Sequence, residues 1–156
     1  MTFQVHALSP QPFADLFTLP DTQLAARRAR RVIVRENPGT PCRVTLEDAE
    51  IGETVLLINF DHLPVDSPYR ASHAIFVREG ASQAHPAMDE VPHVLKLRLI
   101  SLRVFDDADM MITADVAEGE DLHEALMHAF SDPNATYIHL HYAKPGCFAA
   151  SVTRAD

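Results

Sequence analysis

Short segments with the apolar pattern of β-strands, in which a period of two is typical, recur along the chain. The expected strands are 3–8, 31–35, 53–60, 73–78, 97–105, 110–116 and two segments on either side of Lys144-Pro145-Gly146. In the third of them, residues 55–58 are apolar at every position, which predicts a central strand covered on both faces.

One segment follows the helical period instead. Its apolar positions recur at i, i+3, i+4, i+7 and i+8: Leu122, Ala125, Leu126, Ala129 and Phe130. We expect an amphipathic helix over about 119–131, and short N-terminal helices at 12–19 and 21–29. Strands outnumber helices and most connections look like hairpins, so the sequence predicts an α+β fold. It would be one domain, 1–156, with a mainly antiparallel sheet and the helix packed on one face.

Composition agrees with a globular protein, because 47% of the 156 residues are hydrophobic. No charged start followed by an apolar run marks a secretory signal at the N-terminus. The longest aliphatic run, Val55-Leu56-Leu57-Ile58, is far too short to cross a bilayer. We therefore expect a cytoplasmic protein without membrane contact, in which Cys42 and Cys147 are reduced.

The net charge of −9 comes from one segment, which extends from Val104 to Ala143. It contains no Lys or Arg and nine acids: Asp106, Asp107, Asp109, Asp115, Glu118, Glu120, Asp121, Glu124 and Asp132. An acidic surface repels phosphate backbones, so nucleic acid is not an expected partner. A solvated acidic face is the simplest interpretation, because the segment lacks the spacing of a calcium-binding loop.

Five arginines lie within nine residues at the opposite end of the chain: Arg27, Arg28, Arg30, Arg31 and Arg35. An exposed basic helix face explains them best, since no aromatic residue is interleaved to stack on bases. A phosphate contact stays an alternative. The glycine-rich nucleotide motifs, HExxH and GxSxG do not occur, and no cofactor is expected.

The last two strands can be aligned by requiring that one face be apolar. A three-residue loop at 144–146 pairs Tyr142 with Phe148, Leu140 with Ala150 and Ile138 with Val152. A five-residue loop of the same parity remains open, because Pro145 is disfavoured at its position in the shorter turn. In both cases the register gives this hairpin one apolar and one polar face.

The opposite face of this hairpin would then hold Tyr137, His139, His141, Cys147, Ser151 and Thr153. Two chemistries fit this set. An imidazole can activate a neighbouring thiolate for covalent catalysis, or the thiol and both imidazoles can bind a divalent metal. We take Cys147, His141 and His139 as the candidate catalytic residues and assign no metal ligands. The alternatives are a small buried Cys147 and histidines that lie on the surface or contact a partner.

Four further residues are candidates for ligand binding: Cys42, Arg43, Tyr69 and Arg103. Arginines in apolar strands need a partner, because an unpaired buried charge is costly. For Arg43, Arg98 and Arg103 we expect that partner to be an internal carboxylate, with a bound anion as the alternative.

The chain resembles a bacterial family known only as domain of unknown function 1203. The likeness rests on Pro41-Cys42-Arg43, Gly52-Glu53 before Val55-Leu56-Leu57, Ser67-Pro68-Tyr69, Ile75-Phe76-Val77, the strand from Leu99 to Phe105, Tyr137-Ile138-His139 and Gly146-Cys147-Phe148. Two positions depart from it. Val77-Arg78-Glu79-Gly80 stands where a His and often a Cys is expected, which weakens a metal site with a third cysteine. His141-Tyr142 stands where relatives tend toward His-Asn or Arg-Asn.

The resemblance supplies no activity. We expect a protein that binds a small molecule in a pocket between the final hairpin and the loops around Cys42 and Tyr69. Whether it is an enzyme stays open. The alternative is a non-catalytic interaction module that forms a homodimer through an exposed strand or the histidine-rich face.

Overall fold

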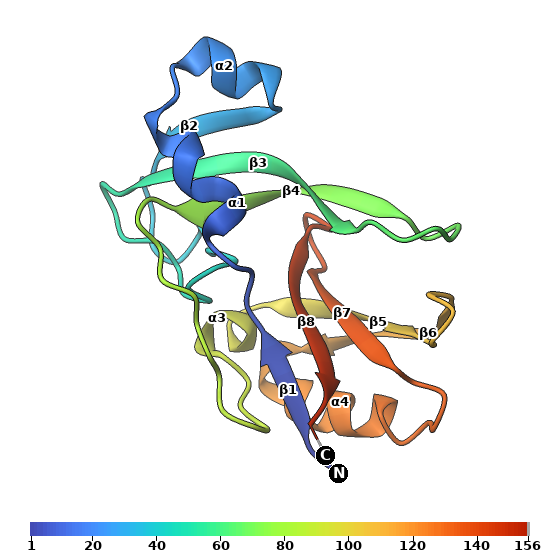
Figure 1. Cartoon of the computed structure of the whole chain (residues 1–156). Helices are drawn as coiled ribbons and strands as arrows, with labels where there is room; N and C mark the ends of the chain where they lie inside the picture. Colours follow the sequence, from blue (N-terminus) through green and yellow to red (C-terminus); the bar gives the residue numbers. More distant parts are fainter. Residues whose placement is uncertain (156) are drawn as a thin grey trace.

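A computed structural model describes residues 1–155 and arranges them as two antiparallel sheets (Figure 1). The first sheet has the strand order β1-β8-β7-β5-β6 and the second has the order β2-β3-β4. The strands of the first are β1 (Phe3–His6), β5 (Leu99–Phe105), β6 (Met111–Glu118), β7 (Tyr137–Tyr142) and β8 (Phe148–Arg154). Those of the second are β2 (Ala29–Ile33), β3 (Thr54–Leu63) and β4 (Ala71–Arg78).

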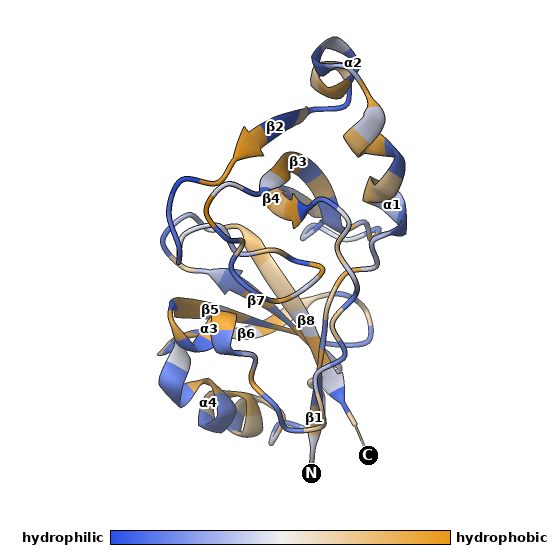
Figure 2. Ribbon diagram, turned by 90° about the vertical axis from the view of Figure 1, so that its left-hand side faces the viewer, coloured by the Kyte–Doolittle hydropathy of each residue, from blue (hydrophilic) through white to orange (hydrophobic). Residues whose placement is uncertain are grey.

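Helices are short and lie outside the two sheets. They are α1 (Gln11–Ala14), η1 (Asp15–Thr18), α2 (Asp21–Ala26), α3 (His93–Lys96), η2 (Gly119–Asp121) and α4 (Leu122–Ala129). Figure 2 shows the three-stranded sheet and α4 on opposite sides of the five-stranded sheet. None of the helices among residues 1–155 has the length and apolar character needed to span a membrane.

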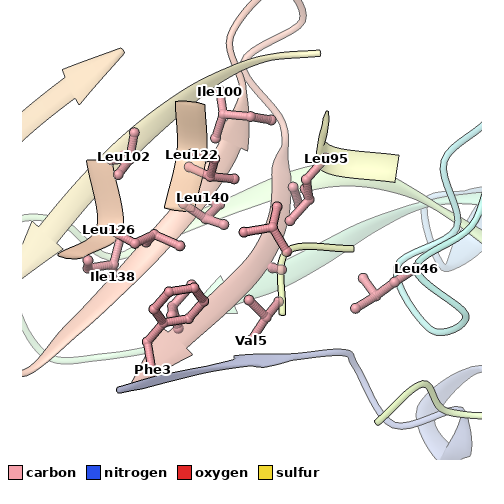
Figure 3. Close-up of a cluster of buried hydrophobic side chains, with 14 of the residues drawn as sticks. Phe3, Val5, Leu46, Leu95, Ile100, Leu102, Leu122, Leu126, Ile138 and Leu140 are labelled. Carbon is pink, nitrogen blue, oxygen red and sulfur yellow. The ribbon is translucent and has the colours of Figure 1, made fainter. Parts of the chain in front are cut away.

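The main hydrophobic core lies between α4 and the five-stranded sheet (Figure 3). Leu122 and Leu126 of α4 pack with Leu102 of β5 and with Ile138 and Leu140 of β7. These five side chains are at most 1% exposed, so α4 covers one face of the sheet completely at this point. The α+β fold and the packing of the helix are as the hydrophobic pattern predicts.

A second core stabilises the three-stranded sheet. Leu56 of β3 and Ile75 of β4 pack with Phe13, Leu16 and Leu24 from the N-terminal helices. The apolar run in β3 belongs to the middle strand of this sheet, as predicted, although the sheet is a separate one.

Several element bounds differ from the sequence predictions. The segment predicted as one helix at 12–19 divides into α1 and η1. The helix predicted at 21–29 ends at Ala26, because Arg28 has a positive φ of 55° and β2 begins at Ala29. Helix α3 was not predicted. With four residues it is too short to show a helical period.

The register of the final hairpin is partly as predicted and partly different. Leu140 pairs with Ala150 and Ile138 with Val152, as expected, but Phe148 pairs with His141 instead of Tyr142. The reason is a β-bulge in β8, where Ala149 is one residue too many for regular pairing. The residues that precede Ala149 in β8 therefore project from the face opposite to the predicted one. Phe148 therefore joins the histidine face, and Cys147 leaves it.

Candidate functional site

The polar face of the five-stranded sheet is turned toward the three-stranded sheet, and a group of histidines lies where the two meet. His139 and His141 alternate with the core residues of β7, and His62 reaches them from the end of β3. Only 9% of His62, 6% of His139 and 1% of His141 is exposed. We call these three residues the histidine cluster.

The nitrogens of the histidine cluster converge. The Nδ1 atoms of His62 and His139 are 3.4 Å apart, and one ring nitrogen from each of the three residues lies within 4.8 Å of the other two. A tetrahedral zinc ion with Zn–N bonds of about 2.0–2.1 Å holds its ligand nitrogens about 3.3 Å apart. Small side-chain rotations would therefore bring all three nitrogens within bonding distance of one ion.

One member of the cluster has its orientation fixed by the backbone. Nδ1 of His141 lies 3.0 Å from the carbonyl oxygen of Gly146, and a carbonyl can only accept, so Nδ1 carries the proton. This leaves a lone pair on Nε2. Metal-binding histidines usually donate their other ring N–H to a carbonyl or carboxylate in the same way.

Two buried nitrogens have no protein partner. Among residues 1–155, nothing forms a hydrogen bond with Nε2 of His62 or Nε2 of His141. Leaving a buried polar atom unsatisfied costs roughly 1–3 kcal/mol, and such atoms are rare unless a bound molecule or ion satisfies them.

Aromatic rings enclose the cluster. Phe148 stacks on His62 with ring centroids 5.1 Å apart and contacts His139 at 5.0 Å. Phe105 meets His139 edge-on at 5.7 Å, and His73 of β4 stacks on His62 at 5.3 Å. The bulge in β8 thus has a direct consequence, since it turns Phe148 toward the imidazoles.

The environment keeps the imidazoles neutral. Burial lowers the pKa of His62 to about 3, that of His139 to about 4 and that of His141 to about 3, with a smaller contribution from the nearby charge of Arg103. Burial and Arg103 also lower the pKa of His73. A neutral imidazole offers its lone pair to a metal ion without first losing a proton.

Cys147, predicted to form a catalytic pair with His141, does not lie on the face of the sheet that carries this histidine. It stands opposite Tyr142, whose N–H donates to the Cys147 carbonyl at 2.9 Å, and its side chain packs against the main core. Its Sγ accepts a hydrogen bond from Nη2 of Arg43 at 2.9 Å. The thiol and the imidazole of His141 therefore project from opposite faces of the sheet, because of the bulge, and the predicted catalytic pair is not formed.

Arg43 is only 1% exposed and directs its donors inward. Nε donates to the carbonyl of Phe148 at 2.8 Å, Nη1 donates to the carbonyl of Pro41 at 2.6 Å, and the guanidinium lies 4.9 Å from the centre of the Tyr142 ring. A pocket of about 500 Å³ lies here, and its lining includes Pro41, Arg43, Tyr142 and Cys147.

The other predicted binding residues are dispersed. Cys42 is buried in the second core, where Sγ accepts from the backbone N–H of Thr45 and of Arg78. Tyr69 is exposed and meets Phe105 edge-on at 5.9 Å. Arg103 is in β5 directly opposite His139, beside the histidine cluster.

Sequence reasoning did not single out His62 or His73. Residues 61–70 were interpreted as a loop, whereas β3 continues to Leu63 and β4 begins at Ala71, with a register shift between Phe60 and Leu63. The available signal was a histidine on each side of the predicted loop, and it did not indicate that these strands cross the histidines of β7.

The two cysteines should differ in accessibility. Both are free, but Cys42 is 1% exposed, whereas Cys147 is partly exposed and lines the pocket. We predict that iodoacetamide modifies the native protein once, at Cys147, as mass spectrometry would show. Cys42→Ser should still be modified, and Cys147→Ser should not. Equal rates of modification at both cysteines would contradict this placement.

The lowered pKa values of the histidine cluster predict a pH-dependent stability. Between pH 6.5 and the folded pKa values, the unfolded chain takes up protons that the folded protein does not. The free energy of unfolding should therefore decrease as the pH falls from 7 to 5, by roughly 1.4 kcal/mol per pH unit for each histidine that stays neutral. Urea unfolding in EDTA, which prevents metal ions from competing with protons, measures this.

The matched variants for that measurement are His62→Leu and His128→Gln. The first removes one buried titrating group and should give a shallower slope, whereas the second changes an exposed histidine of α4 and should not. Glu53, whose pKa is lowered by Arg78, titrates below this pH range. A stability that does not change between pH 7 and 5 would show that the imidazoles are protonated in the folded state.

Comparison with known proteins gives one match. Residues 39–154 match the family described as Protein of unknown function (DUF1203). The searches of curated proteins and of solved structures return no match. The matched region includes the whole histidine cluster, Arg43, Arg103 and Cys147. Since it covers more than half of the chain, the protein belongs to the DUF1203 family.

Proposed function

We propose that the protein binds a divalent transition-metal ion, with zinc as the first candidate, through His62, His139 and His141. The observation that carries the proposal is the meeting of three buried imidazoles whose nitrogens lie within 4.8 Å of one another. Three neutral imidazoles are a ligand set used by catalytic zinc, which keeps its fourth position for water or substrate.

The unsatisfied nitrogens favour this proposal over a purely structural cluster. A structural role is best performed by apolar residues, which have no polar atoms to leave unpaired. The cluster instead retains Nε2 atoms on His62 and His141 without a partner among residues 1–155. Each imidazole binds an ion through one nitrogen only, so coordination by the three rings accounts for the free lone pair on Nε2 of His141 and for histidines, rather than leucines, at these positions.

The proposal agrees with the small-ligand-binding protein expected from sequence, and it moves the site from Cys147 to the histidine cluster. With an open coordination position, a bound zinc ion can activate a water molecule or polarise a carbonyl. The rings of Phe105 and Phe148 would keep bulk water away from the ion. Two free cysteines agree with a cytoplasmic location, which is part of the proposal.

The test is a Zn²⁺ titration of chelator-treated protein, in competition with a chromophoric zinc chelator. We expect one ion per chain in the wild type and at least roughly 100-fold weaker binding in His62→Leu, because loss of a ligand exceeds the 10- to 100-fold effect of losing an outer hydrogen bond. His128→Gln, an exposed histidine, should bind as the wild type does.

Metal-free stability separates this loss from misfolding. Leucine removes the unsatisfied Nε2 of His62 but also the contact of its Nδ1 with Nδ1 of His139 at 3.4 Å, so the two effects oppose each other and metal-free His62→Leu should unfold cooperatively with a stability near that of the wild type at pH 7. Zn²⁺ should then raise the melting temperature of the wild type and not that of the variant. Unchanged zinc binding by His62→Leu, or no binding by the wild type, would overturn the proposal.

A homodimer is a second proposal, and it now rests on an edge strand. The histidine face is buried and cannot be its interface. Strand β6 is an edge of the five-stranded sheet and exposes Ile112 and Val116, at 38% and 55%. Such an edge can pair with the same strand of a second copy.

For this interface, light scattering after size-exclusion chromatography should show a dimer for the wild type and a monomer for Val116→Lys, because a lysine on an edge strand opposes pairing. Glu120→Lys adds the same charge at an exposed position beyond the strand and should leave the dimer intact. A monomeric wild type would refute the interface.

A further inference from the structure

Three arginines were candidates for anion contacts, and the structure distinguishes one of them. Arg98 forms an ion pair with Asp48 at 2.6 Å, and Arg43 directs its donors to two carbonyls and to Sγ of Cys147. Arg103 has no carboxylate within 4.0 Å and no hydrogen-bond acceptor among residues 1–155. Its five N–H donors are available to a ligand.

The position of Arg103 places that charge beside the histidine cluster. Arg103 pairs with His139 across β5 and β7 and with the uncharged Ala114 across β5 and β6. Directly opposed residues project to the same face, with Cβ atoms about 4.5–5.5 Å apart. The ring of His139 in turn lies 5.5 Å from that of His62 and 6.4 Å from that of His141, centroid to centroid, so Arg103 is beside the whole cluster.

Among residues 1–155, no carboxylate forms an ion pair with Arg103 that would balance its positive charge. The nearest elements contribute His62 and His73 from the three-stranded sheet and His139 and His141 from β7, and none of these imidazoles supplies a negative charge. Tyr137, the next residue on this face of β7, donates to the carboxylate of Asp109 at 2.7 Å. A divalent ion on three neutral imidazoles keeps its full charge, so the ion and Arg103 together would attract an anion.

We propose that Arg103 recognises a small oxyanion that also ligates the bound metal, a proposal that rests on the proposed metal site. One oxygen of a carboxylate or phosphate would occupy the open coordination position, and another would accept from the planar guanidinium. Arg103 and His73 are partly exposed, whereas the metal-binding imidazoles are buried, so the oxyanion would approach from the side of these two residues. The substrate or ligand class is therefore a small molecule with an acidic group.

Linkage gives this proposal a test that needs no knowledge of the natural ligand. If metal and oxyanion share the site, each raises the affinity for the other by the same factor. The probe is Co²⁺, titrated into chelator-treated protein and followed by its visible absorption, in buffer whose only small anion is perchlorate. Acetate and methylphosphonate are added in separate arms to represent the two oxyanion sources.

In the wild type, one or both anions should tighten Co²⁺ binding roughly 5- to 150-fold, the usual range of coupling between sites, and shift the absorption spectrum. The arm with the larger effect identifies the acidic group. Arg103→Gln should lose most of this enhancement, while binding Co²⁺ without oxyanion at least as tightly as the wild type, because a repelling charge has been removed. Arg35→Gln, an exposed arginine, should behave as the wild type.

The outcomes separate the two proposals. Co²⁺ binding that neither anion changes, or an enhancement that survives in Arg103→Gln, overturns the role of Arg103 and leaves the metal site standing. Failure of Co²⁺ to bind the wild type overturns both. Urea unfolding of Arg103→Gln in EDTA establishes that the variant is folded, so that loss of the enhancement cannot result from misfolding.

Discussion

The arrangement of the molecule depends on the two faces of β7. Ile138, Leu140 and Tyr142 bury one face of this strand against α4, and the alternation of side chains then directs His139 and His141 to the other face. The three-stranded sheet covers that second face, so the two imidazoles have little contact with bulk solvent. Burial in turn keeps the imidazoles neutral, and a neutral imidazole has a lone pair that can coordinate an ion.

Much of the fold could be predicted from periodicity, because both cores follow it. The period of 3.6 located α4, and the period of two located β5, β6, β7 and β8. Periodicity does not reveal how two sheets lie against each other, however. The chain therefore indicated that His139 and His141 share a face, but not that His62 of a different sheet meets them there.

The predicted pairing of Cys147 with His141 is not formed because of a single residue. The register was derived from parity, and Ala149 adds one residue to β8 that parity cannot reveal. Because of that bulge, the histidine face carries the aromatic ring of Phe148 where the prediction had the thiol of Cys147. Arg103 was singled out as an arginine in an apolar strand, and the structure places it opposite His139. Its lack of an acidic partner could not be foreseen, because ion pairs depend on tertiary contacts.

The most direct test of the metal site is a crystal structure of the zinc-loaded protein, with anomalous data measured at the zinc edge. The account predicts one anomalous peak per chain between β3 and β7, with nitrogens of His62, His139 and His141 at about 2.0–2.1 Å. A peak bound to Cys147, or a cluster without zinc in a protein that carries it elsewhere, would contradict the account.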